Sequence, residues 1–265
     1  MLIDFHTHAF ADSLAPRAIA SLSAASGGLN PYTDGTYQGL VGSMDKCGVD
    51  HSVLLTIATK PTQQTRINDW AASLNQGRVS VFGSIHPDAP DVFEELERIK
   101  SLGLAGVKLH PEYQNFCVDE DRMKPIYKKL ASLGLITVFH SGMDIGFLPP
   151  ARATVDRMIR ALPAFDGAPV VAAHFGGYNE WDEVLEKMCG LPIYLDTSFC
   201  FGRIQYPLAQ AIAEKHGSER ILFGTDLPWS DAETELRLIH SLKLSEEEKD
   251  NILWKNAAKL LHLNV

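Results

Sequence analysis

The chain has 265 residues, 45% of them hydrophobic and 22% charged, and its formal net charge is -9. This length suits one large domain or two small ones, and the acidic balance argues against nucleic acid or an anionic membrane as a partner. No run approaches the roughly 20 apolar residues of a membrane span, and no charged segment followed by an apolar stretch opens the chain. We therefore expect a cytoplasmic protein that acts on a small molecule. The sequence leaves open whether the chain forms a homo-oligomer.

Eight short apolar or β-branched runs predict strands, and segments of helical length and period separate them. This βα alternation, repeated eight times in a chain near 250 residues, predicts a closed (β/α)8 TIM barrel that forms a single domain over residues 1–265. An open doubly wound sheet is the alternative, but no strand is followed by the glycine-rich GxGxxG loop of that fold. The predicted strands lie at 2–6, 52–57, 79–85, 106–110, 135–140, 169–174, 193–196 and 220–225.

Three segments outside the predicted strands carry further signals. Apolar residues three and four apart predict a helix over 91–99, and Ser245 with Glu248 three residues later forms a capping box that starts the final helical stretch. Residues 11–39 are the longest irregular insertion and are rich in Ala, Ser and Gly. Their place after the first strand makes them either a lid over the barrel mouth or an ordinary surface loop.

Histidines gather where the predicted strands end. His6 and His8 are two residues apart, so that their side chains point the same way. The carboxyl ends of parallel strands meet on one face of a barrel, and Asp226 follows the last strand on that face. Neutral imidazoles and a carboxylate are ligands for a divalent metal. The six histidines at strand ends are His6, His8, His86, His110, His140 and His174.

The fourth predicted strand has a clear pattern of faces. Val107 and Leu109 suit the helix-covered exterior, which leaves Lys108 and His110 pointing inward. A buried ammonium group is costly without a partner, so we expect Lys108 to pair with an inward carboxylate such as Asp4 or to contact the substrate.

Short motifs in a fixed order span nearly the whole chain. They are DFHTH at 4–8, MDKCGVDHSVLL at 44–55, GVKLHP at 106–111, TVFHSG around His140, AAHFGG around His174 and FGTDLPW at 223–229. With these motifs the chain resembles the amidohydrolase superfamily, and more closely the branch that includes aminocarboxymuconate-semialdehyde decarboxylase.

The resemblance implies a set of site residues. The implied metal ligands are His6, His8, His140 and Asp226, and the implied catalytic residues are Asp226 and His174. A second metal site would draw on His174, Lys108, His110 and Glu112. In some amidohydrolases the fourth strand carries a carboxylated lysine that bridges two metals. We expect one Zn²⁺, or another divalent metal, per chain and an unmodified Lys108, because Lys108 is set back two residues from His110.

Two activities fit this implied site. Our first hypothesis is a metal-dependent hydrolase, in which metal-activated water attacks an amide, lactone or ester carbonyl of a small molecule and Asp226 moves the proton. The alternative is a metal-dependent, non-oxidative decarboxylase of an unsaturated or aromatic carboxylate. A catalytically silent metal-binding protein is disfavoured, since every expected position is filled.

We expect apolar and aromatic walls around the site, with a basic residue that holds a substrate carboxylate. The candidates for the basic residue are Lys60 and Arg203. The aromatic candidates are Phe10, Phe147, Tyr178, Trp181, Phe199, Phe201 and Trp229.

Overall fold

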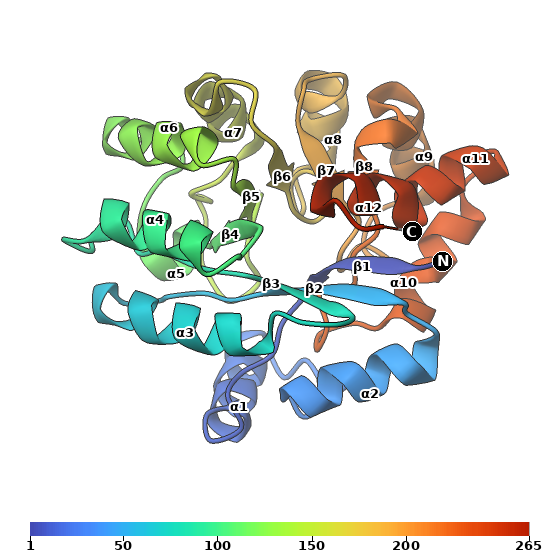
Figure 1. The fold of residues 1–265 in the computed structure, drawn as a ribbon. Coiled ribbons are helices and arrows are strands. Elements are labelled where there is room, and N and C mark those ends of the chain that lie inside the picture. Colours follow the sequence, from blue (N-terminus) through green and yellow to red (C-terminus); the bar gives the residue numbers. More distant parts are fainter. Residues whose placement is uncertain (265) are drawn as a thin grey trace.

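Eight parallel strands form the centre of the molecule in the computed structural model, which describes residues 1–264 (Figure 1). All eight predicted strands are present, and all but β1, which is shifted by one residue, are shorter than the sequence pattern suggested. The strands are β1 Ile3–Thr7, β2 His51–Leu55, β3 Val79–Phe82, β4 Gly106–Leu109, β5 Ile136–Phe139, β6 Val170–Ala172, β7 Tyr194–Asp196 and β8 Ile221–Leu222.

The strands close into a TIM barrel, as predicted. β1 to β3 form one parallel sheet and β4 to β8 form another. Backbone hydrogen bonds join the two sheets at both edges: Phe5 donates to Phe223 at 2.8 Å, and Gly83 donates to Gly106 at 2.9 Å. Because both edges are bridged, the ring of strands is continuous, and all carboxyl ends lie on one face.

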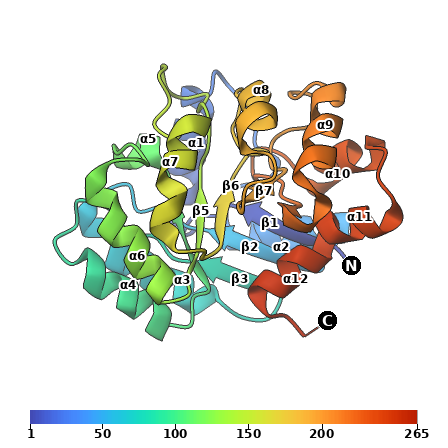
Figure 2. The same cartoon turned by 90° about the horizontal axis from the view of Figure 1, so that it is seen from above.

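Helices surround the barrel, as Figure 2 shows from above. The predicted helix over 91–99 is confirmed as α4, and the capping box of Ser245 and Glu248 is present at the start of α11. The helices are α1 Ala15–Ala25, α2 Tyr37–Cys47, α3 Gln64–Leu74, α4 Val92–Ser101, α5 Pro111–Gln114, α6 Lys124–Ser132, α7 Val155–Ala161, α8 Trp181–Glu183, α9 Tyr206–His216, α10 Ala232–Ser241, α11 Glu246–Asp250 and α12 Asn256–Leu261.

The core has an inner and an outer part. The outer part lies between the strands and the helices and includes Val107 and Leu109, which confirms the predicted faces of β4. Ala257 and Ala258 of α12 pack against the inner part, at the end of the barrel opposite the strand carboxyl ends. The inner part contains Ile3, Phe5, Val53, Leu55, Phe82, Ile136, Val138, Val171 and Leu222.

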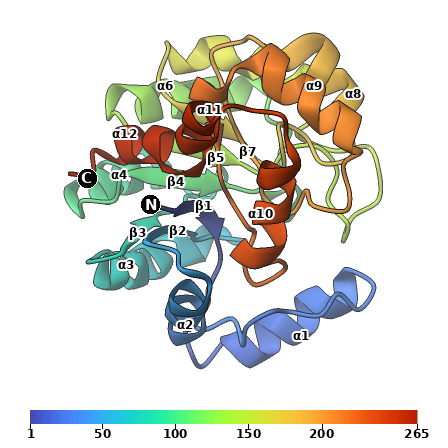
Figure 3. The same cartoon turned by 90° about the vertical axis from the view of Figure 1, so that its right-hand side faces the viewer.

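The insertion at 11–39 is not irregular, which corrects the sequence interpretation. It contains the whole of α1 and the start of α2. Pro16 stands in the first turn of α1, where proline is tolerated, and the alanine-rich sequence has high helix propensity. Figure 3 shows α1 set apart from the barrel, beyond α2. Whether this segment moves as a lid stays a prediction.

A bulge in β1 sets the direction of the first histidine. From Asp4 to Thr7, β1 uses three residues where its partner β2 uses two. Bulges re-aim side chains next to active sites. Here His6 lines the cavity at the barrel mouth, although its neighbour Phe5 packs in the inner core.

No helix within residues 1–264 combines the length and the apolar character that a bilayer crossing requires.

Candidate active site

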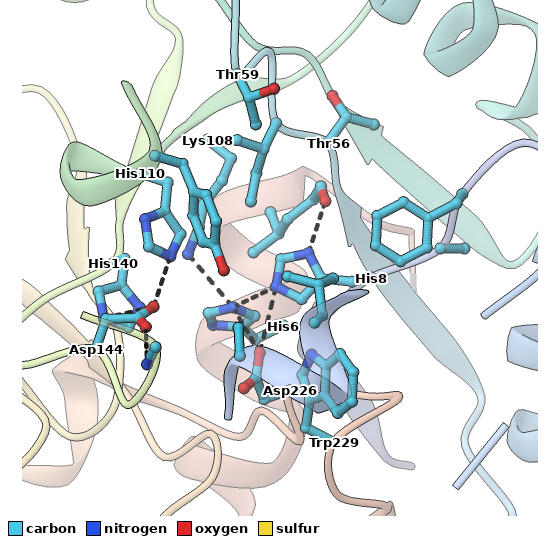
Figure 4. A pocket seen from close by; sticks show the side chains of 18 of the residues that line it. His6, His8, Thr56, Thr59, Lys108, His110, His140, Asp144, Asp226 and Trp229 are labelled. Atoms are coloured by element: carbon cyan, nitrogen blue, oxygen red, sulfur yellow. Dashed lines mark hydrogen bonds and ion pairs between the residues drawn. The ribbon is translucent and has the colours of Figure 1, made fainter. Parts of the chain in front are cut away.

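A cavity of about 560 Å³ opens at the carboxyl ends of the strands. Most of the residues expected at the site lie in its wall, and Figure 4 shows how their side chains converge. The predicted residues in this wall are His6, His8, Lys108, His110, His140, His174 and Asp226.

Three donor atoms form a nearly equilateral triangle in this wall. His6 Nε2 lies 3.2 Å from His8 Nε2 and 3.4 Å from Asp226 Oδ1, and His8 Nε2 lies 3.2 Å from the same oxygen. Ligand bonds of 2.0–2.1 Å in tetrahedral geometry place neighbouring donors about 3.3 Å apart. The triangle therefore has the dimensions of three ligands around one divalent cation.

The other nitrogen of each imidazole is already occupied. His6 Nδ1 donates to Asp196 Oδ2 at 2.8 Å, and His8 Nδ1 donates to the Leu55 carbonyl at 2.9 Å. These bonds fix the tautomer that leaves the Nε2 lone pair free for a metal. Burial, followed by the charge of Lys108, lowers the pKa of His6 to about 3, so that the ring is neutral at pH 7. The donor set fits a divalent metal.

Sequence reasoning missed Asp196, the residue that orients His6. Asp196 ends β7, is fully buried, and also accepts hydrogen bonds from the backbone of His174 and from the Ser198 hydroxyl. Burial alone would raise its pKa, but the electrostatic interaction and the hydrogen bond with His6 hold the pKa below the usual range for a carboxyl group. An acidic residue at a strand carboxyl end was the available signal.

The predicted fourth ligand lies in a separate group. Donor atoms of His110, His140 and Asp144 lie within 4.8 Å of one another. The His140 ring stacks on His110 at 4.3 Å between centroids, and its Nδ1 lies 2.9 Å from His174 Nε2. The structure therefore brings His6, His8 and Asp226 together and places His140 beside them, next to Asp144, which sequence reasoning missed.

The residues proposed for a second metal do not form one group. Glu112 Oε2 is 3.9 Å from His110 Nδ1, and Glu112 Oε1 accepts the backbone hydrogen of Arg152. His174 contacts His140 and Ser198 instead. Its backbone is in the left-handed region, with φ 59°, as is that of Asp226 with φ 68°. Such strain is often found at functional positions.

The side chain of Lys108 reaches the donor triangle. It is fully buried, and its Nζ lies 3.3 Å from His6 Nε2. Burial lowers the pKa of this ammonium to about 8. The expected pairing with Asp4 is wrong, because Asp4 accepts hydrogen bonds from Thr225 and from the backbone of His6. Lys108 lies two residues before His110 along β4, but its long side chain spans that distance. Its position in the strand therefore does not keep its ammonium group away from a metal.

The walls of the cavity are mainly apolar, as expected. Lys60 and Arg203 do not line it, and the Arg203 guanidinium instead covers the Phe199 ring at 3.4 Å. Trp181 is also outside the wall and donates to the His174 carbonyl. The aromatic residues in the wall are Phe10, Tyr178, Phe199 and Trp229, which were expected, and Trp70 and Tyr113, which were not.

Several solved structures share this fold over nearly their whole length. The 2,6-dihydroxybenzoate decarboxylase in complex with 2,6-dihydroxybenzoate is 17% identical, with a TM-score of 0.73 and 99% of each chain covered. The 5-carboxyvanillate decarboxylase of Sphingomonas paucimobilis is 18% identical, with a TM-score of 0.71 and the same coverage. A dihydroxybenzoic acid decarboxylase of Polaromonas sp. JS666, with manganese and 2-nitroresorcinol bound, is 18% identical, with a TM-score of 0.70 and 100% and 97% of the two chains covered. No protein with a curated description matches the sequence.

These comparisons correct the first functional hypothesis. Most of the similar structures with a named reaction are decarboxylases, which contradicts the hydrolase and favours the alternative that the sequence left open. The family model described as Amidohydrolase matches residues 3–263. The chain therefore belongs to the amidohydrolase family, and its fold is the TIM barrel of that family.

Proposed function

We propose that the protein is a metal-dependent, non-oxidative decarboxylase of an aromatic or unsaturated carboxylate. The observation that carries the proposal is the donor triangle of His6, His8 and Asp226, with the Lys108 ammonium beside it in a mainly apolar cavity. The decarboxylases with the same fold support it.

The donor triangle would hold one divalent cation. Two imidazoles and a carboxylate suit Zn²⁺, which we propose, and Mn²⁺ is the alternative because it is bound in the Polaromonas decarboxylase. We also propose His140 as the fourth ligand. When bound, the cation supplies positive charge that holds the oxygen atoms of an anionic substrate.

The reaction replaces a carboxylate with hydrogen. The bond between the carboxylate and its carbon breaks, CO₂ leaves, and the electron pair that remains on the carbon takes up one proton. The positive charge of Lys108 would attract and orient the carboxylate before the bond breaks. Apolar walls favour neutral CO₂ over a charged carboxylate, because an ion loses hydration there.

We assign the proton transfer to Asp226 and His174. Both line the cavity, where Asp226 is a member of the donor triangle and His174 Nε2 lies 2.9 Å from His140 Nδ1. Burial would raise the pKa of Asp226, but hydrogen bonding to His8 and the electrostatic interaction with His6 lower it to about 2. As an anion, Asp226 can receive a proton and pass it on to the substrate carbon.

The test is CO₂ release from a panel of hydroxybenzoates, with 5-carboxyvanillate and 2,6-dihydroxybenzoate included, by protein loaded with Zn²⁺ or Mn²⁺. In D₂O the product should carry one deuterium at the carbon that lost CO₂. Amides, lactones and esters of the same ring serve as controls. Hydrolysis of these controls without CO₂ release from any acid would overturn the proposal.

A further inference from the structure

The cavity extends well beyond the donor triangle, into the space between α1 and α3. Leu22 and Ala25 are three residues apart on α1, so they share a face, and both line the cavity. Ile67 and Trp70 do the same on α3. Figure 1 shows the two helices on the same side of the barrel. We name this part the apolar compartment for its side chains Leu14, Leu22, Ala25, Leu29, Ile67 and Trp70. Ser13, Ser26, Gln63 and Arg66 from the same segments also line the cavity.

Charge is concentrated at the other end of the cavity. Of the charged side chains of residues 1–264 that line it, Lys108, Asp144 and Asp226 lie at the strand ends with the histidines. The remaining one is Arg66, which is exposed on α3. The apolar compartment therefore has no buried charge to match a second carboxylate on a ligand.

The cavity is larger than a single substituted ring requires. A monohydroxybenzoate has ten non-hydrogen atoms, and at no more than the roughly 30 Å³ that a water molecule takes in the liquid, these fill about 300 Å³ at most. The cavity measures about 560 Å³, a volume in the range that holds larger organic ligands. A one-ring acid at the strand ends would thus leave the apolar compartment in contact with water, which is unfavourable for its leucine and tryptophan side chains.

We infer that the acid that binds here carries an uncharged, apolar extension, an alkyl chain or a second ring, on the side away from its carboxylate. The inference rests on the proposed decarboxylase and names its substrate class. The carboxylate lies at the strand ends beside Lys108, and the extension fills the apolar compartment between α1 and α3.

A homologous series tests this inference. In 4-alkyl-2-hydroxybenzoates, from methyl to hexyl, the chain leaves the ring opposite the carboxylate. Both affinity, measured by calorimetry with the metal-loaded protein, and kcat/KM for CO₂ release should rise about fourfold for each added CH₂ group. A carboxylate at the end of the chain should cancel the gain. Comparison with 3-hydroxy-2-naphthoate separates a preference for a chain from one for a second ring.

A matched pair of variants locates the binding of the chain. Ala24 and Ala25 are both exposed alanines in α1, and only Ala25 lines the cavity. Ala25→Trp should reduce the ratio of hexyl to methyl affinity at least tenfold, whereas Ala24→Trp should keep the wild-type ratio. Thermal melting of both variants checks that α1 is still folded.

The outcomes separate the two proposals. If affinity rises along the series but no acid releases CO₂, the ligand class stands and the decarboxylase fails. If one-ring acids release CO₂ and neither added carbons nor the naphthoate improves affinity, the decarboxylase stands and the inference is overturned. An equal loss of the hexyl-to-methyl ratio in both alanine variants would also overturn it.

Discussion

The direction of the two imidazoles at the end of β1, His6 and His8, depends on groups that accept hydrogen bonds from their Nδ1 atoms. His6 has Asp196 as its acceptor, and His8 has the Leu55 carbonyl. Both acceptors come from other strands, so no pattern within the sequence His6-Thr7-His8 reveals them. The histidines themselves could be predicted from spacing, because a period of two is a local property of a strand.

We expect Asp196→Asn to weaken metal binding about 10- to 100-fold. An amide is a weaker acceptor than a carboxylate for His6 Nδ1, so the ring and its tautomer are held less firmly. Competition titration with a chelating dye measures the change. Asp182→Asn, on the exposed surface of α8, is the control and should bind metal as the wild type does. Equal affinity in all three proteins would show that Asp196 does not support the site.

Variants of the two residues assigned to proton transfer should differ in how much metal they bind. Asp226→Asn should lower kcat at least about 100-fold and also weaken metal binding, because an amide cannot carry the proton and is a poorer ligand. His174→Asn should lower kcat strongly while the metal content stays at the wild-type level. Elemental analysis and steady-state kinetics on one established substrate measure both. Loss of metal from His174→Asn would make His174 a ligand instead.

At the scale of elements, one carboxyl group of α10, that of Glu235, hydrogen-bonds to both the loop after β7 and the loop after β8. Glu235 is buried and accepts hydrogen bonds from the backbone of Cys200 and Phe201 and from the Ser230 hydroxyl. Burial raises its pKa to about 7, well above the ordinary 4.5. These loops also carry Phe199 and Trp229 of the cavity wall, so this carboxyl group supports the shape of the site.

Because the pKa of Glu235 is raised in the folded protein, the free energy of unfolding decreases as the pH rises. The folded protein keeps the proton up to about pH 7, whereas the unfolded chain loses it above pH 4.5, so stability present below pH 4.5 is lost as the pH rises to 7. The loss is about 1.4 kcal/mol per pH unit, or about 2 kcal/mol between pH 5.5 and 7. Urea unfolding at several pH values should show this slope in the wild type and a smaller one in Glu235→Gln. The exposed control Glu219→Gln should keep the wild-type slope, and an unchanged slope in Glu235→Gln would contradict the assignment.

The elements also show why the insertion was misread. Residues 11–39 contain no long apolar run, and α1 has only Ala15 fully buried, so the usual alternation of apolar and polar positions is faint. Its inner face borders a cavity instead of a packed core. Eight strands could be predicted because each is buried on both faces and reads as a compact apolar run.

For the whole molecule, the barrel explains which site residues could be found in advance. A closed ring of parallel strands brings every carboxyl end to one face, so a histidine or aspartate at a strand end is a candidate whatever its position in the sequence. The same rule does not say which donors share one ion. Neighbouring strand ends in a ring lie close together, and His140 lies between His174 and the pair of His110 and Asp144.

The number of metals is therefore a prediction about the whole site. We expect one equivalent of Zn²⁺ or Mn²⁺ to give full activity, with Lys108 unmodified in the intact mass. A ligand at 100 times its Kd stabilises the folded state by about 2.7 kcal/mol, so addition of the metal should also raise the Tm. Asp144→Asn distinguishes the two donor groups, because it removes a carboxylate that belongs only to the group of His110 and His140 and leaves the four proposed ligands of the first metal in place. Two equivalents in the wild type and one in this variant, or a mass gain of one CO₂ on Lys108, would show a second metal and overturn the single-ion site.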